Sequence, residues 1–151
     1  LSAIILPAGV FDVVARLASW DDHHATYVEA ADQVAADWIS ANTPANATVA
    51  AAPTAGSWVP LLTGRPLTLG YEGWLWSQGV DYAPRADALA ALARGEIAPA
   101  CAAGVRYAVA DPDFWQRFPG DPAALARAAT LRWQQATPRG PRLIYELPCS
   151  R

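Results

Sequence analysis

Short apolar segments with strand character alternate with helical segments along the chain, and this alternation constrains the fold more than any other feature. Val105–Ala110 (VRYAVA) is the clearest strand, because Asp111 and Pro112 follow it and end it. Thr48–Ala52 and Leu67–Leu69 are two further short strand candidates. Such alternation is typical of an α/β domain in which helices cover the faces of a mostly parallel sheet. A length of 151 residues suits one such domain.

Helical spacing is strongest in Asp21–Ser40. One stripe of this segment carries Tyr27, Ala31, Val34 and Trp38, and Val28, Ala35 and Ile39 lie beside it. We expect that stripe to pack on the sheet, with Trp38 contributing the largest apolar area. The helix should stop near Asn42 and Pro44.

Three more helices are expected from their terminal residues. A brief helix over Trp58–Thr63 should be closed by Gly64, a second should run from Pro84 to just before Gly95, and a third should start at Asp121 and Pro122. Between the first two lies Gly70–Tyr82 (GYEGWLWSQGVDY), which we expect to be irregular.

The last part of the chain predicts a closing β-hairpin. Leu131–Gln135 and Leu143–Leu147 have strand character and bracket a turn at 138–141. The expected fold is therefore α/β, with a mostly parallel sheet, helices on both faces and an antiparallel hairpin at one edge.

The apolar content is high for a domain surrounded only by water. Hydrophobic residues make up 53% and charged residues 17% of the chain. Leu1–Phe11 (LSAIILPAGVF) carries no charge, and two interpretations stay open: the end of a membrane-spanning helix, or an apolar element buried in the domain. We expect the first, with residues 1–18 as helix end and linker and residues 19–151 as the domain. Because the chain starts at Leu1 and contains no methionine, we expect it to be a piece of a longer protein.

Several function classes are excluded by charge and by missing motifs. A net charge of -3 without a basic cluster does not suit nucleic-acid binding. His23 and His24 are adjacent and point in different directions on a helix, and the chain has neither a GxSxG elbow nor a phosphate-binding glycine loop. The turn 53–57 (PTAGS) is interpreted as supplying helix caps, Thr54 and Ser57, and not phosphate ligands. We expect no catalytic residue, no metal site and no cofactor in this chain.

Cys101 and Cys149 are the only cysteines. They could form a disulfide in an oxidising compartment, or they could be two ordinary buried thiols.

The densest group of aromatic and polar side chains lies between residues 70 and 85. The candidate ligand-binding residues are Tyr71, Trp74, Trp76, Asp81, Tyr82 and Arg85. Aromatic rings with a polar edge suit stacking on a sugar ring or seating at a membrane interface. The alternative is that these rings pack beneath a long loop.

The order of several segments resembles a known class of membrane proteins. Five segments resemble the C-terminal soluble domain of multi-spanning bacterial and archaeal proteins that look like GT-C glycosyltransferases: AGVFDVVAR (8–16), AADWISANTPANATV (35–49), TGRPLTLGYEGWLWSQGVDYAPR (63–85), GVRYAVADP (104–112) and the final LIYELP (143–148). The resemblance covers nearly the whole chain and is most specific in GYEGWLWSQGVDY followed by Arg85. It implies a small Rossmann-like three-layer domain on the extracytoplasmic side of a bacterial cell membrane. It also implies that sugars carried on polyprenyl phosphate are used there, with the catalytic acid on a loop between early membrane helices outside this chain.

Three hypotheses about function follow. The favoured one is an accessory, non-catalytic domain whose segment 70–85 contacts a lipid-linked sugar or a glycan acceptor, with the transmembrane part of the parent protein as its partner. The second is a structural or partner-binding domain of a membrane protein with no ligand site. The third, a free-standing small-ligand enzyme, is disfavoured by the missing phosphate loop and the missing base.

Overall fold

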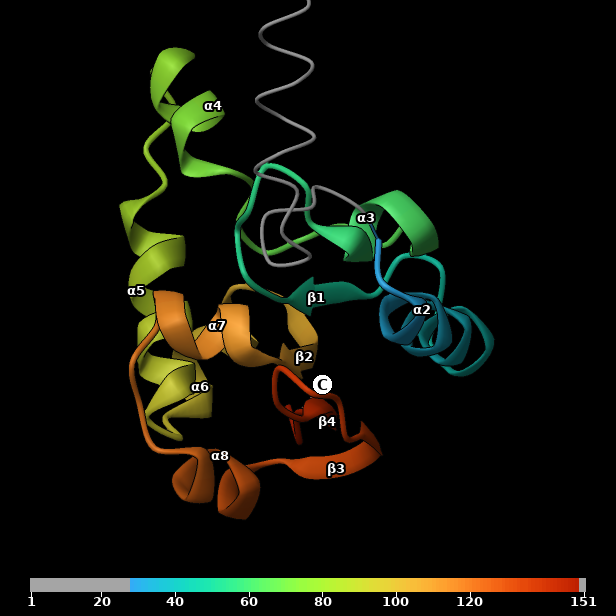
Figure 1. The fold of residues 1–151 in the computed structure, drawn as a ribbon. Helices are drawn as coiled ribbons and strands as arrows, with labels where there is room; N and C mark the ends of the chain where they lie inside the picture. Colours follow the sequence, from blue (N-terminus) through green and yellow to red (C-terminus); the bar gives the residue numbers. More distant parts are fainter. Residues whose placement is uncertain (1–27, 150–151) are drawn as a thin grey trace, which may run out of the picture.

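The computed structural model describes residues 28–149. Their helices and strands are, in chain order, α2 (Ala30–Asn42), β1 (Thr48–Ala50), α3 (Trp58–Thr63), α4 (Glu72–Ser77), α5 (Ala83–Ala93), α6 (Ile97–Ala102), β2 (Val105–Ala110), α7 (Pro112–Arg117), α8 (Pro122–Ala128), β3 (Thr130–Gln135) and β4 (Arg142–Glu146). Figure 1 shows the strands in the middle of the domain, with helices around them. The α/β class expected from the sequence is confirmed.

The sheet is mixed and has the strand order β1-β2-β4-β3. β1 pairs with β2 in parallel, whereas β4 pairs antiparallel with both β2 and β3. The predicted hairpin is confirmed, but the expectation of a mostly parallel sheet is wrong. The reason is the placement of the hairpin: β4, whose side chains are largely buried, enters the middle of the sheet, and the polar β3 forms the edge.

Each face of the sheet has its own hydrophobic core. On β2, Ala108 and Ala110 belong to one core and Val109 to the other, as the alternation of side chains along a strand requires. Helices α5 to α8 contribute to the first core, and α2 and α3 contribute to the second. Figure 1 shows these two groups of helices on opposite sides of the strands.

Helix α2 packs with a different face from the one predicted. Its buried residues are Asp32, Ala35, Ala36 and Ile39. Val34 is 49% exposed, and Trp38 is only partly buried at the margin of the second core. Ala35 and Ile39, which were expected beside the stripe, are buried, but the stripe itself is not the buried face. The small side chain of Ala36 and the carboxylate of Asp32 complete that face, and apolar spacing does not reveal them. The helix ends near Asn42 as predicted, but it begins at Ala30 with Glu29 as its N-cap, so the expectation of one continuous helix from Asp21 is wrong.

The segment 70–82 is not irregular throughout, because Glu72–Ser77 forms the short helix α4. None of its residues is buried. In Figure 1, α4 stands away from the sheet at the upper left. Only Leu75 of this helix packs against the first core, and a single apolar contact gives no periodicity that the sequence could reveal.

The expected end of a membrane-spanning helix, Leu1–Phe11, and the expected domain boundary at residue 18 lie outside the described residues. Within residues 28–149, no helix has the length and hydropathy needed to cross a membrane.

Of the two alternatives for the cysteines, the structure shows the disulfide. Cys101 and Cys149 form it, and it joins α6 to the segment that follows β4.

Candidate functional site

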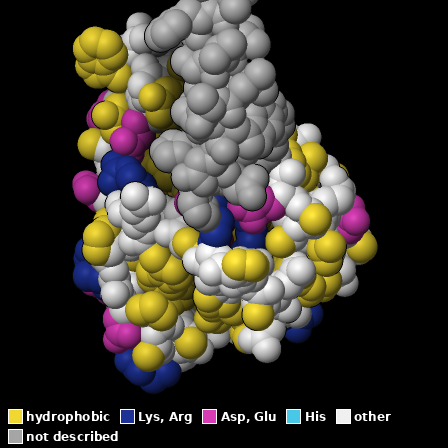
Figure 2. Space-filling view, in the orientation of Figure 1, with side chains coloured by type: hydrophobic (Ala, Val, Ile, Leu, Met, Phe, Trp, Pro, Cys, Tyr) yellow, Lys and Arg dark blue, Asp and Glu magenta, His cyan; other side chains and the backbone are white. Residues whose placement is uncertain are grey.

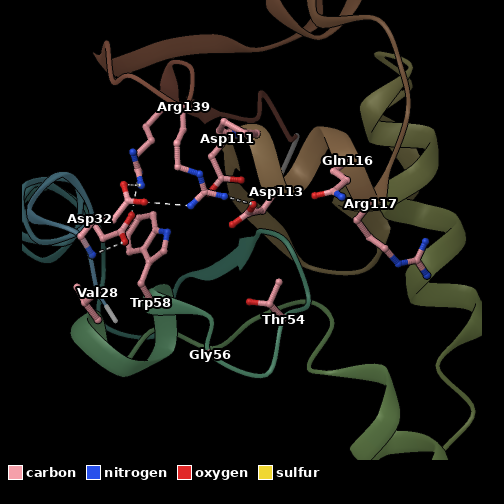
Figure 3. A pocket seen from close by; sticks show the side chains of 13 residues that line it. Val28, Asp32, Thr54, Gly56, Trp58, Asp111, Asp113, Gln116, Arg117 and Arg139 are labelled. Carbon is pink, nitrogen blue, oxygen red and sulfur yellow. Dashed lines mark hydrogen bonds and ion pairs between the residues drawn. The ribbon is translucent and has the colours of Figure 1, made fainter. Parts of the chain in front are cut away.

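A hollow of about 610 Å³ lies at the carboxyl ends of the parallel strands β1 and β2. Residues after β1, among them Thr54 and Trp58, form one wall. Residues after β2 form another, namely Asp111, Pro112, Asp113, Gln116 and Arg117. Figure 3 shows the side chains of Trp58, Asp111 and Asp113 facing a common space. Ends of parallel strands are a frequent place for ligand sites, because the loops that leave adjacent strands diverge there.

The floor of the hollow is an ion-pair network centred on Arg142, at the start of β4. Its Nε donates to Asp32 Oδ1 at 2.8 Å and its Nη2 donates to Glu29 Oε2 at 2.6 Å. Arg139 extends the network, because it donates to Glu29 Oε1 and to Asp113 Oδ1, both at 3.0 Å. Charged groups from α2, the β3–β4 turn and α7 thereby meet in one place.

The Arg142–Asp32 pair is unusual because both side chains are removed from water. Arg142 is 5% exposed and Asp32 is 6% exposed. Asp32 Oδ2 also accepts a hydrogen bond from the backbone N–H of Glu29 at 2.9 Å, at the beginning of α2. Burial disfavours the ionised form of Glu29, but hydrogen bonds from Arg139 and Arg142 outweigh it and lower the pKa of this carboxyl. The two arginines therefore favour the ionised form of Glu29.

Asp111 is the most perturbed group of the hollow. It caps α7 by accepting a hydrogen bond from the backbone N–H of Phe114 at 2.8 Å. Burial raises its pKa to about 6, and the nearby Asp113 carboxylate adds to this effect. The Phe114 N–H, the Arg142 charge and the Trp58 side chain act in the opposite direction and offset it in part. The Asp111 carboxyl thus changes its charge near neutral pH, as functional carboxyls in clefts often do.

We predict that Asp111→Asn removes a pH dependence of stability. Folded Asp111 holds a proton up to about pH 6, whereas in the unfolded chain it ionises near its ordinary pKa of 3.8. Between these values the folded state binds more protons, so the free energy of unfolding falls as pH rises from about 4 to 6. It should then level off. The total change should be about 2 kcal/mol.

Chemical denaturation of both proteins from pH 4 to 7.5 would measure this effect. Asparagine caps helices as well as aspartate does, so α7 should keep its start. The variant should lose the fall in stability over this window. An unchanged pH profile would show that Asp111 titrates normally in the folded protein.

The residues predicted from the sequence lie elsewhere, on and beside α4. Trp74 is 60% exposed and Trp76 is 75% exposed. Tyr71 lies edge-on to Trp74, with 5.5 Å between ring centroids. Figure 2 shows hydrophobic side chains standing out at the upper left, where α4 lies in Figure 1. We call Tyr71, Trp74, Trp76 and Val80, which are all exposed, the aromatic projection.

The remaining three predicted residues do not join the aromatic projection as a group. Asp81 Oδ1 accepts the backbone N–H of Ala83 at 3.1 Å at the start of α5, which is a local capping role. Tyr82 packs against the first core, and Arg85 is exposed. Within the described residues Asp81 and Arg85 form no ion pair with each other.

One ion pair joins the two regions. Arg117 of α7, which lines the hollow, donates to Glu72 Oε1 in the first turn of α4. In Figure 3 the Arg117 guanidinium is directed away from Asp111 and Asp113. The base of the aromatic projection is thereby attached to one wall of the hollow.

The sequence did not predict the hollow. It indicated Asp111 only as the residue that ends a strand, and Thr54 and Ser57 only as helix caps. Thr54 lines the hollow, and Ser57 occupies the N-cap position of α3 without a capping hydrogen bond from its side chain. The available signal was an aspartate at the carboxyl end of the clearest strand. Comparison of the chain with protein-family models, with curated proteins and with solved structures found no match.

Proposed function

We propose that this chain is an accessory, non-catalytic domain of a membrane-embedded, GT-C-like glycosyltransferase. Its aromatic projection contacts a lipid-linked sugar or a glycan acceptor near the extracytoplasmic surface of the membrane. The observation that supports this proposal is the exposure of Trp74 and Trp76 on a helix with no buried residue. Exposed indoles that contribute nothing to the core suit contact with a sugar face or a membrane interface. A Rossmann-like relationship belongs to the same proposal and is supported by the parallel β1–β2 pair.

A second candidate is a structural role, in which the aromatic projection packs on the membrane part of the parent protein. It is favoured by one observation: none of the six residues predicted from the sequence lines the hollow described above. An exposed apolar group without a cavity also suits a protein contact. The two candidates differ in whether a sugar is contacted.

We predict that Trp76→Ala in the intact parent protein reduces sugar transfer about tenfold while leaving folding unchanged. The loss corresponds to one aromatic contact of about 1.4 kcal/mol. Stability should change by less than about 0.5 kcal/mol, because the side chain is largely exposed. Transfer from a labelled polyprenyl-phosphate sugar and thermal melting would be measured in parallel.

Leu131→Ala provides the control, because Leu131 is an exposed apolar residue on β3 outside the aromatic projection. It should leave both transfer and melting unchanged. Full transfer by Trp76→Ala and by Trp74→Ala would reject the sugar-contact role. Lower melting together with lost transfer would instead support the structural candidate.

A further inference from the structure

The aromatic projection stands on a fixed base. Leu75 of α4 and Tyr82 after it pack against the first core. The ion pair between Glu72 and Arg117 attaches the first turn of α4 to α7. Behind the helix, the backbone N–H of Val80 donates to the carbonyl oxygen of Leu75 at 3.0 Å. The rings are therefore held in place without a partner, so contact with them requires little further ordering.

Helix geometry keeps both tryptophans of the aromatic projection out of the core. Successive residues of an α-helix are turned by about 100°. Because Leu75 packs on the core, Trp74 and Trp76 point to the two flanks of α4, about 160° apart. Figure 1 shows α4 standing clear of the sheet, and the two side chains are 60% and 75% exposed. A flat protein surface can cover only one flank, whereas fluid lipid can surround both.

The exposed area also favours lipid over a protein partner. Tyr71 is 40% exposed and Val80 is 44% exposed. With the two tryptophans they offer about 400 to 500 Å² of apolar surface. A stable protein interface buries about 800 Å² on each partner, so this area is too small for one by itself. Entry into a bilayer interface has no such threshold, because binding there increases with each apolar side chain that enters.

The charges around the aromatic projection indicate which lipid it suits. The described segment 70–90 carries three carboxylates and one guanidinium, namely Glu72, Asp81, Asp87 and Arg85. Glu72 is paired with Arg117. This segment therefore has no excess of positive charge that would attract anionic headgroups. Its contact with lipid should depend on the rings and not on the charge of the membrane.

We propose that the aromatic projection inserts into the headgroup region of a lipid bilayer, with the rings of Trp74 and Trp76 among the headgroups. Indole and phenol rings suit this region because they are apolar and carry one polar group that stays hydrated. The partner is the lipid itself, not a second copy of this chain or another protein. The proposal rests on the function proposed above only in placing the domain beside a membrane, and it adds a contact that requires no sugar.

The first test measures where the indoles lie. The ¹⁵N-labelled chain is mixed with sugar-free bicelles of phosphatidylcholine that contain a spin-labelled phosphatidylcholine. We expect the spin label to broaden the NMR signals of the Trp74 and Trp76 indole N–H groups. The signals of Trp58, which is buried, and of Trp133 on the edge strand β3 should stay sharp. Sharp signals of Trp74 and Trp76, or equal broadening of all four, would overturn the proposal.

The second test separates the aromatic projection from the apolar segment Leu1–Phe11. Trp74→Ser combined with Trp76→Ser should weaken partition into sugar-free phosphatidylcholine vesicles at least about tenfold. Val34→Ser combined with Leu131→Ser is the control, since both residues are exposed and lie outside the aromatic projection, on α2 and β3. It should leave partition unchanged. Thermal melting would check that both variants fold.

Two vesicle results would contradict the proposal. Unchanged partition of the tryptophan variant would show that another part of the chain carries the binding. Replacing one third of the lipid with phosphatidylglycerol should change partition less than about twofold, because the segment 70–90 has no basic excess. A much larger increase would show that charge, and not the rings, drives the contact.

The failure of this proposal can be distinguished from failure of the proposed function. If Trp74 and Trp76 stay out of lipid but Trp76→Ala still loses sugar transfer, only the lipid contact is rejected. If they enter lipid and Trp76→Ala transfers sugar fully, only the sugar contact is rejected. Gel filtration that shows a dimer of the unchanged chain and a monomer of the tryptophan variant would assign the surface to a second copy and overturn the lipid contact.

Discussion

Replacing Arg142 with methionine should lower the free energy of unfolding by about 3 to 5 kcal/mol. Methionine keeps much of the aliphatic volume, so the loss reports the charge and not a cavity. Without the guanidinium, Asp32 would remain buried with only the backbone N–H of Glu29 as a described partner. The cost of an uncompensated buried carboxylate is what makes the effect large.

Arg132→Met is the matched control for this experiment. Arg132 pairs with Glu146 across the exposed β3–β4 edge at 3.2 Å, and both side chains are about half exposed. Removing that pair should cost less than about 1 kcal/mol. Adding Asp32→Asn to Arg142→Met should recover part of the loss, because the unpaired charge disappears. Equal losses for Arg142→Met and Arg132→Met in urea denaturation would contradict the assignment of Arg142 as a buried, stabilising centre.

Replacing both Cys101 and Cys149 with alanine should lower the free energy of unfolding by about 4 kcal/mol. The disulfide closes a loop with a sequence separation of 48 residues, which restricts the unfolded chain strongly. That loop contains β2, β3 and β4, so the crosslink spans three of the four strands. A loss of this size is a large part of the stability of an ordinary domain.

Reduction offers an independent check of the disulfide prediction. Dithiothreitol should lower the melting temperature of the unchanged protein toward that of the double alanine variant. The same reagent should have no effect on the double variant, which has no cysteine left. A melting temperature that is insensitive both to the reductant and to the double substitution would refute the stabilising role.

The sequence predicted those elements whose signals are local. The sequence predicts β2 at Val105–Ala110 because a mainly apolar segment ends there at Asp111 and Pro112. α3 was placed at Trp58–Thr63, closed by Gly64, whose φ of 66° is a conformation that glycine adopts without strain. Capping residues, prolines and glycines act through the backbone of their immediate neighbours, so their effects can be predicted without the fold.

Predictions failed where burial, and not local preference, determines the structure. The large residues Val34 and Trp38 suggested a face of α2 that is not the most buried one, because the buried face includes Asp32, whose burial is compensated by Arg142 and by the backbone N–H of Glu29. α4 escaped prediction because only its partly buried Leu75 packs against a core, which leaves no apolar periodicity. The sheet was expected to be mostly parallel because strand order cannot be obtained from the order of strands along the chain.

The sequence by itself determined the α/β class, the closing hairpin and the concentration of aromatic and polar side chains between residues 70 and 85. Only the tertiary structure decided that the tryptophans of α4 are exposed and that a charged hollow forms at the ends of β1 and β2. The hollow brings Asp32, Asp111 and Arg142 together, although up to 110 residues of chain separate the hydrogen-bonded partners. Propensity and capping depend on neighbours a few residues apart, whereas ion pairing, desolvation and the pKa of Asp111 depend on distances that exist only after the strands have paired.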